Sequence, residues 1–307
     1  MNEVRELSDR ITILRDGVVI VDGVPMSEKT DEEIVSDMLG EKLEAEEKKH
    51  KNENAFENAD EVLSIAFDGH EGEYTVKAGE IVGLAGLAGS GRSSVLRTIW
   101  GTKPRGDIHL RYLGEEYKPK NPMHALKKKI AYISEDRSES GLFFGQPIKE
   151  TVLMAHRNLQ RKLLVKNKSE DKLLGQIIGE VQIKVPTHEC MPEALSGGNQ
   201  QKLLFGRWIT DEAKLLLLDE PTRGVDIKTK HEIYQRVRKM VEANNAGALV
   251  VSSELEELVL MCDKVLIIRD GHVEDVLTGD RITENNMMAE ITASGKTKQQ
   301  TEDNKSV

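Results

Sequence analysis

The segment Gly86-Leu-Ala-Gly-Ser-Gly91-Arg92-Ser93 lies between two stretches of different character, and it decides the fold. The residues before it, Glu80-Ile-Val-Gly-Leu-Ala85, form an apolar run that predicts a strand. The residues after it, Ser94-Val-Leu-Arg-Thr-Ile-Trp100, predict a helix. A strand, a glycine-rich loop and a helix in this order allow backbone N–H groups to surround phosphate oxygens. The segment therefore predicts a phosphate-binding loop, with an ordinary glycine-rich turn as the alternative.

Two residues of this loop set its expected chemistry. Ser93 is placed to ligate Mg²⁺, because phosphate-binding loops supply a hydroxyl at this position. Arg92 stands where such loops usually carry lysine, and its guanidinium is a planar fork rather than a compact ammonium. Nucleotide binding is therefore expected, with slow hydrolysis at this loop. The candidate nucleotide-binding residues are Gly86, Gly89, Ser90, Gly91, Arg92, Ser93 and Ser94.

The composition narrows the class of protein. The chain has 307 residues, and 43 lysines and arginines against 53 acidic residues give a net charge of -10. This balance argues against a dedicated nucleic-acid-binding protein, which usually presents a basic face. The two cysteines, Cys190 and Cys262, match no metal-binding spacing. No apolar run reaches the roughly 18 residues of a membrane helix, and the start lacks the apolar core of a signal peptide. We therefore expect a soluble, cytoplasmic protein that reaches a membrane through a partner.

An internal repeat links the two ends of the chain. Residues 3–17 align without a gap with residues 257–271, and Thr30-Asp31 then matches Thr283-Glu284 after a shift of one residue. Both copies predict the end of a helix, a buried strand, an Arg-Asp-Gly turn and another strand. In the second copy this unit closes a long domain. We therefore expect residues 1–40 to be the C-terminal remnant of a first, similar domain, with chance similarity as the alternative.

The rest of the chain predicts one main domain at residues 61–293. Strand and helix patterns alternate there, which predicts an α/β fold with a mostly parallel sheet. The segment at about 143–195 has helical patterns without such strands and is expected to be a helical insertion. Residues 41–60 are rich in charge and predict a linker, and the polar tail 294–307 is expected to be disordered. The expected strands are Ile81–Ala85, Ile130–Ile133, Leu215–Leu218, Ala248–Val251 and Val265–Ile268.

Two further motifs carry chemistry. The apolar run 215–218 ends in Asp219 and Glu220, at the sheet edge where phosphates bind. Asp219 can hold Mg²⁺ through water, and Glu220 can orient or deprotonate the attacking water. Ser196 and the residues after it precede an amphipathic helix at 202–209, so its hydroxyl and the following N–H groups can face an anion. The full motif, called the signature below, is Leu195, Ser196, Gly197, Gly198, Asn199, Gln200 and Gln201.

The motifs resemble those of an ABC nucleotide-binding domain in their order along the chain. That order is the phosphate loop, residues 195–201, residues 215–220 and Gly224-Val225-Asp226. Glu135-Asp136-Arg137 stands where most such domains carry a glutamine loop, and Ser253-Glu254 stands where most carry a switch histidine. With Arg92, these departures resemble the second nucleotide-binding domain of simple-sugar importer ATPases, the ribose, galactose, arabinose and xylose type, in which two domains are fused. The resemblance covers residues 62–291 and the fragment 3–40.

The resemblance implies a fold with an antiparallel β subdomain and ATP sites shared between two domains. Ser196, Gly197, Gly198, Asn199 and Gln200 would then act in trans, on the nucleotide of a partner domain, and Gly224 and Asp226 would touch that partner. In this chain's own site, Glu220, Ser253 and Glu135 are the expected catalytic residues, and Ser93 and Asp219 the expected metal ligands.

The same resemblance implies ATP and Mg²⁺ as cofactors, membrane permease subunits as partners, and a sugar-binding protein as an indirect partner, without nucleic acid. The expected place is the cytoplasmic face of the membrane. An aromatic residue before the phosphate loop usually stacks on adenine in such domains, and Phe67, His70 and Tyr74 are candidates. A role in the core is the favoured alternative, because Tyr74 alternates with Val76 as a strand core residue does. The alternative is a degenerate, non-catalytic nucleotide-binding module whose signature completes a partner's site. A soluble ABC protein acting on ribosomes or in DNA repair is disfavoured by the acidic charge.

Overall fold

The computed structural model describes residues 2–15, 17–39, 55–160, 167–208 and 213–293. At its centre is a six-stranded sheet that is parallel except at one edge, where β12 runs antiparallel to β11. The α/β fold with a mostly parallel sheet is therefore confirmed. Most of the predicted linker at 41–60 and the whole predicted tail at 294–307 lie outside the described residues. The strand order is β12 (His272–Thr278), β11 (Lys264–Arg269), β5 (Ile81–Ala85), β10 (Gly247–Val251), β9 (Leu215–Asp219) and β8 (Ile130–Ile133).

The five strands expected from apolar runs are all present, within one residue of the expected bounds. They are apolar throughout because the sheet is covered on both faces. In β9, Leu216 and Leu218 pack into one core while Leu215 and Leu217 pack into the other. Successive side chains of a strand point to opposite faces, so one short leucine run supplies both cores.

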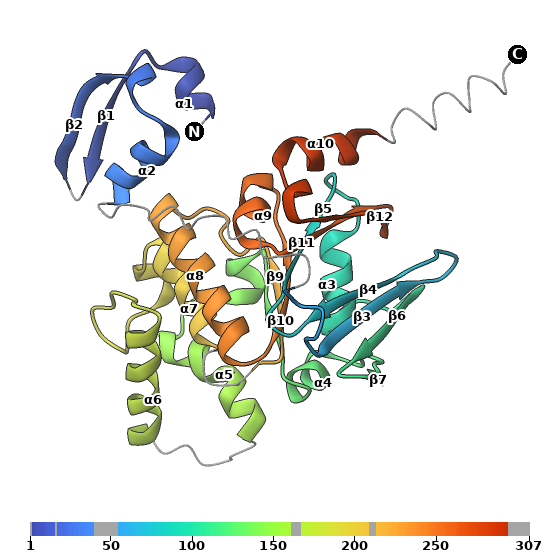
Figure 1. Ribbon diagram of the computed structural model, residues 1–307. Coiled ribbons are helices and arrows are strands. Elements are labelled where there is room, and N and C mark those ends of the chain that lie inside the picture. The colour runs from blue at the N-terminus through green and yellow to red at the C-terminus, as the bar shows by residue number, and fades with distance from the viewer. Residues whose placement is uncertain (1, 16, 40–54, 161–166, 209–212, 294–307) are drawn as a thin grey trace, which may run out of the picture.

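One face of the sheet is covered by α3 (Arg92–Trp100) and by a second, antiparallel sheet (Figure 1). Val95, Leu96 and Ile99 of α3 are buried between the two sheets. The helix α4 (Pro122–Lys127) follows this subdomain and is capped by Asn121, whose side chain accepts from the His124 N–H. The antiparallel order is β4 (Glu73–Lys77), β3 (Glu61–Phe67), β6 (Ile108–Tyr112) and β7 (Glu115–Glu116).

Helices cover the other face (Figure 1). Between residues 143 and 195 the described part of the chain contains helices and no strand. The domain boundaries drawn from the sequence stay a prediction. The helices of this side are α5 (Ile148–Gln160), α6 (Asn167–Glu180), η3 (Pro192–Ala194), α7 (Gly197–Gly206), α8 (Ile227–Ala243) and α9 (Leu255–Met261), and α10 (Glu284–Ala293) ends the described chain; a π-helical turn, η2 (Arg137–Gly141), precedes α5.

The N-terminal unit repeats the end of the chain, element for element. It contains α1 (Asn2–Leu7), β1 (Arg10–Arg15), β2 (Val18–Pro25), η1 (Met26–Glu28) and α2 (Asp31–Leu39). The C-terminal counterpart is α9, β11, β12, η4 (Gly279–Arg281) and α10. In the described residues β1 pairs with β2 alone, whereas β11 pairs with β12 and also, in parallel, with β5.

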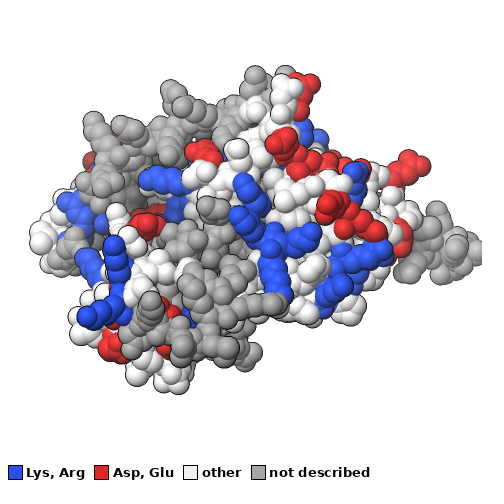
Figure 2. Space-filling view, turned by 90° about the horizontal axis from the view of Figure 1, so that it is seen from below, with Lys and Arg blue, Asp and Glu red and all other residues white. Residues whose placement is uncertain are grey.

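The surface carries both signs of charge. Seen from below, lysine and arginine side chains gather over the middle of the molecule, and most of the acidic side chains in view lie toward the right edge (Figure 2). The chain as a whole has a net charge of -10. Among the residues that the structure describes, no helix is long and apolar enough to cross a membrane.

Candidate functional site

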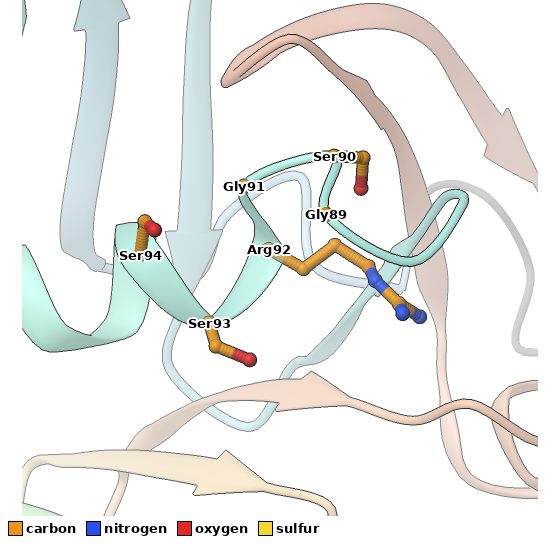
Figure 3. Close-up of a pocket in the computed structure, with 6 residues that line it drawn as sticks. All are labelled: Gly89, Ser90, Gly91, Arg92, Ser93 and Ser94. Carbon is orange, nitrogen blue, oxygen red and sulfur yellow. The ribbon is translucent and has the colours of Figure 1, made fainter.

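The phosphate loop connects β5 to α3 and borders a hollow of about 140 Å³ lined by residues 89–94 (Figure 3). The helix begins after Gly91, which has φ 101° and gives no side-chain cap. The first N–H groups of α3 therefore lack helical partners and are available to an anion. Packing also requires glycine at position 91, because a β-carbon there would come within 2.9 Å of the Gly271 Cα. At Gly86 a β-carbon would lie 2.3 Å from the Ile268 carbonyl oxygen.

The serines of the loop differ in their surroundings. The Ser90 hydroxyl is buried and has no hydrogen-bond partner among the described residues. In Figure 3 the side chains of Ser90, Arg92 and Ser93 point to the same side of the loop, and Ser94 lies farther along the helix. The Ser94 hydroxyl accepts a 2.7 Å hydrogen bond from Lys103 Nζ. An unpartnered buried hydroxyl next to free N–H groups fits a phosphate group in this loop.

Asp219 meets the phosphate loop at the carboxyl end of β9. Its side chain is fully buried, and it accepts hydrogen bonds from Ser93 Oγ at 2.7 Å and from the Tyr132 hydroxyl at 3.0 Å. Arg97 Nη2 lies 3.9 Å from the same carboxylate. Burial, followed by the charge of Asp219, raises the pKa of Tyr132, which keeps it a hydrogen-bond donor. A serine hydroxyl and a carboxylate at this distance are oxygen donors that suit Mg²⁺.

Glu220 follows Asp219 and turns away from the strand. Its backbone is left-handed, with φ 51°, and its N–H donates to the Val251 carbonyl at 2.9 Å. The Ser253 hydroxyl donates to Glu220 Oε2 at 3.0 Å. The structure therefore brings together two of the expected catalytic residues from the ends of neighbouring strands. A left-handed conformation is uncommon for a residue other than glycine, and such strain concentrates at functional sites.

Arg92 makes a long-range hydrogen bond that the sequence does not indicate. Its Nη1 donates to the Ser252 carbonyl at 2.7 Å, 160 residues away in the chain. Ser252 in turn donates from its hydroxyl to Glu257, which also accepts from the Thr222 hydroxyl. Burial raises the pKa of Glu257, which is 2% exposed. Arg92 thus joins the phosphate loop to the segment that carries Ser253.

Glu135, the third expected catalytic residue, lies in an ion pair with Arg223. Arg223 precedes Gly224 in the turn that leads to α8. Glu135 therefore joins the loop after β8 to this turn, and in the described residues it makes no hydrogen bond with Glu220 or Ser253. Its assignment as a catalytic residue stays a prediction.

The signature residues start α7. Ser196 is its N-cap, is exposed, and accepts from the Asn199 N–H at 3.4 Å. Gln200 Nε2 donates to the carbonyls of Pro192 at 3.0 Å and Leu195 at 3.3 Å, which fixes the turn before the helix. In the described part of the chain, no hydrogen bond or ion pair joins this motif to the phosphate loop. The two motifs are not brought together within one chain.

Asp226 is the N-cap of α8. It accepts from the Thr229 N–H at 2.9 Å and from the Thr229 hydroxyl at 2.8 Å. Burial opposes ionisation of Asp226, but the hydrogen bonds from Thr229 outweigh it and the pKa is lowered. Gly224 has φ +69°, a conformation that favours glycine. The expected partner-facing turn therefore has a defined local structure.

Two of the aromatic candidates for stacking on adenine contact His272, a residue that the sequence did not single out. The ring of His70 stacks on His272, with centroids 3.9 Å apart, and Phe67 contacts His272 edge-on at 5.4 Å. His272 lies beside the phosphate loop because the adjacent Gly271 N–H donates to the Ser90 carbonyl at 2.8 Å. The local signal was the Arg-Asp-Gly turn before His272. Tyr132 lies in the expected strand 130–133, but its hydrogen bond to Asp219 had no signal in the sequence.

Comparison with known proteins agrees with this fold. The profile of the ABC transporter family matches residues 70–223. The chain therefore belongs to the ABC transporter family. It is 33% identical over 299 residues to the ribose import ATP-binding protein RbsA of Bacillus cereus, covering 94% of this chain and 58% of that protein. It is 36% identical over 285 residues to a putative ribose/galactose/methyl galactoside import ATP-binding protein of Hahella chejuensis, covering 90% and 54%. The chain thus spans little more than half the length of these curated relatives.

Solved structures match the fold. An ATP-binding cassette of an ABC transporter, MJ1267 in its ADP conformation, has a TM-score of 0.60 at 17% identity, covering 76% of this chain and 95% of that one. The cassette MJ0796, described as dimeric and bound to ADP and phosphate, has a TM-score of 0.59 at 20% identity, covering 72% and 97%. At these identities the likeness concerns the fold, which is the ABC cassette fold with its antiparallel subdomain.

Proposed function

We propose that this chain is the ATP-binding, ATP-hydrolysing subunit of an ABC importer for a simple sugar. The observation that carries the proposal is the hydrogen bond between Ser93 and Asp219 beside a phosphate loop with free N–H groups. Glu220 follows Asp219 in the chain and accepts a hydrogen bond from Ser253. The substrate class is supported by the names of the relatives, which are ribose and galactose import proteins. The sugar itself is recognised by other subunits.

The chain's residues would divide the chemistry as follows. The loop N–H groups and Ser90 hold the phosphates of ATP, and Ser93 and Asp219 hold Mg²⁺. Mg²⁺ bound there would supply positive charge that stabilises the transferring phosphoryl group. Glu220, oriented by Ser253, accepts a proton from the water that attacks the γ-phosphorus. The bond to the bridging β,γ-oxygen breaks, and ADP and phosphate leave.

The signature residues 196–200 would serve a second nucleotide-binding domain, with Gly224 and Asp226 against the same partner. This part of the proposal is supported by the exposure of Ser196 and by its separation from the chain's own phosphate loop. ATP bound between two domains closes them, and hydrolysis releases them. Closure would drive permease subunits at the cytoplasmic face of the membrane, which receive sugar from a binding protein; no nucleic acid is involved.

Residues 1–40 are proposed to be the end of a first nucleotide-binding domain, with 41–60 as a linker, 61–293 as the second domain and about 143–195 as its helical insertion. The support is the common element order of the two repeats. In the second copy β11 lies beside the strand that enters the phosphate loop, β5. The equivalent edge of β1 would pair with the phosphate-loop strand of the first domain.

A second candidate is a non-catalytic module that binds nucleotide and completes a partner's site. It is favoured by Arg92, which donates to the Ser252 carbonyl, and by Ser253 at the switch position, where a hydroxyl replaces an imidazole. A cation displaced from the transferring phosphoryl group lowers transition-state stabilisation by several kcal/mol, on the order of 3. Binding would then remain while turnover is lost.

MgATP turnover separates these candidates. We expect little turnover by the chain alone and a rise of tenfold or more, the order expected for one completed set of catalytic contacts, when a matching first nucleotide-binding domain is added. Flat activity with retained nucleotide binding would favour the non-catalytic module. Absence of nucleotide binding would contradict both. Copurification with a membrane permease tests the importer assignment separately.

A further inference from the structure

The loop after β8, residues 134–141 with the π-helical turn η2, lies along α7 and is hydrogen-bonded to both ends of that helix. Arg137 Nη1 donates to the Gly197 carbonyl, at the start of α7, at 2.9 Å. Arg207, the residue after the helix, donates in the opposite direction, to the carbonyls of Gly141 and, at 3.1 Å, Thr151. Arg207 is buried, with 6% exposed. Two arginines, one from each element, therefore hold the loop and the helix together at two points.

The start of α7 also packs directly on the first turn of α8 and on the turn before it. A β-carbon on Gly198 would lie 2.8 Å from the Thr229 hydroxyl, and one on Gly197 would lie 3.3 Å from the Gly224 carbonyl. The Arg137 guanidinium lies against Gly197 and Gly224. A β-carbon on Gly197 would lie 3.4 Å from Arg137 Nη1, and one on Gly224 would lie 3.2 Å from Arg137 Nη2. The glycines leave the space that the guanidinium occupies, so signature and turn share one arginine.

The charge of Arg137 does not explain this placement. A cation near a helix N-terminus is opposed by the helix dipole. Burial also lowers the pKa of Arg137, because removal from water disfavours its charged form. The planar guanidinium can contact two backbone segments at once, which a lysine ammonium does less well. The arginine is therefore suited to fix geometry, at a site where its charge is not favoured.

We propose that Arg137 is a positioning residue for a partner domain's nucleotide. It holds the signature residues 196–198 and the turn 224–226 as one surface. The inference rests on the proposed shared site and assigns the effect to the nucleotide in trans. In the described residues, no hydrogen bond or ion pair joins Arg137 to this chain's own phosphate loop.

Amide hydrogen exchange on the full chain, without nucleotide or partner, tests the positioning. The Gln200 N–H donates to the Ser196 carbonyl at 2.9 Å and reports on the first turn of α7. In Arg137→Ala we expect exchange of the amides of residues 200–201 to rise about fivefold, the effect of losing one net hydrogen bond. Arg137→Lys should lie between, and Arg111→Ala, a distant exposed arginine, should leave these amides unchanged. Unchanged exchange in Arg137→Ala would overturn the inference.

Turnover stimulated by a matching first nucleotide-binding domain tests the action in trans. This chain carries Ser93→Ala, so the stimulated turnover comes from the phosphate loop of the added domain and depends on this chain's signature. Adding Arg137→Ala should lower the stimulated turnover about tenfold, on the order of a lost positioning contact. Adding Arg111→Ala should leave it unchanged, and Arg137→Ala alone should leave this chain's own affinity for ATP unchanged. Unchanged turnover, or an equal loss of this chain's own affinity, would contradict the proposal.

These results are distinguishable from a failure of the proposed function. Exchange is read in the free chain, so it is independent of ATP hydrolysis. A chain that binds no nucleotide but shows the expected exchange pattern would keep the positioning role and lose the function. A normal ATPase with unchanged exchange in Arg137→Ala would do the reverse.

Discussion

Gly198→Ala tests whether the signature helix and α8 pack as closely as the structure shows. The added methyl would lie 2.8 Å from Thr229 Oγ1 and 3.2 Å from Thr229 Cγ2. Thr229 cannot rotate away freely, because its hydroxyl and N–H both bond to Asp226. Overpacking of this kind costs about 2 kcal/mol, and replacing a helical glycine by alanine returns about 1 kcal/mol. We expect a net loss of about 1 kcal/mol in the free energy of unfolding.

The same substitution in a Thr229→Ala background should have the opposite sign. There the two close atoms are gone, and the methyl faces a β-carbon at 3.4 Å, an ordinary contact. Gly198→Ala should then stabilise by about 1 kcal/mol, which gives a coupling of about 2 kcal/mol. Urea unfolding of the four variants measures this cycle. A coupling below about 0.5 kcal/mol, the usual limit of additivity, would refute the close packing.

Three further outcomes are expected. Ser196→Arg should abolish turnover stimulated by a partner domain while this chain's nucleotide affinity stays nearly intact; equal loss of both would count against action in trans. Arg92→Lys should raise turnover only together with Ser253→His, because both ends of the γ-phosphate need support; a full gain from Arg92→Lys alone would sink that account. Because burial raises the pKa of Glu257 above its usual 4.5, the protonated form is favoured in the folded state, and this stabilisation is lost as pH rises through the raised pKa. Urea midpoints of wild type should therefore fall relative to Glu257→Gln from about pH 4.5 upward; parallel pH profiles would contradict the assignment.

The glutamine-loop and switch positions show how far local signals reach. The sequence places Glu135 and Ser253 by their distance along the chain from better-marked motifs, and the structure gives them different surroundings. Ser253 donates to Glu220, as a catalytic neighbour would. Glu135 pairs with Arg223, which the sequence offers no way to foresee. Loop side chains find partners through the turns on either side, so spacing alone locates the loop without locating its contacts.

The sequence by itself determined the phosphate loop, the Asp219-Glu220 strand end, the signature helix and the repeat, because each is written in consecutive residues whose apolar period and glycine content dictate local conformation. The tertiary structure alone decided that Arg92 reaches Ser252, that His272 stacks on His70 and that Arg137 lies between two glycines. These contacts depend on strand order and on the direction of side chains from elements far apart in the chain. No short-range pattern carries that information, because the contacts form only when the strands assemble into the sheet and its two faces are covered.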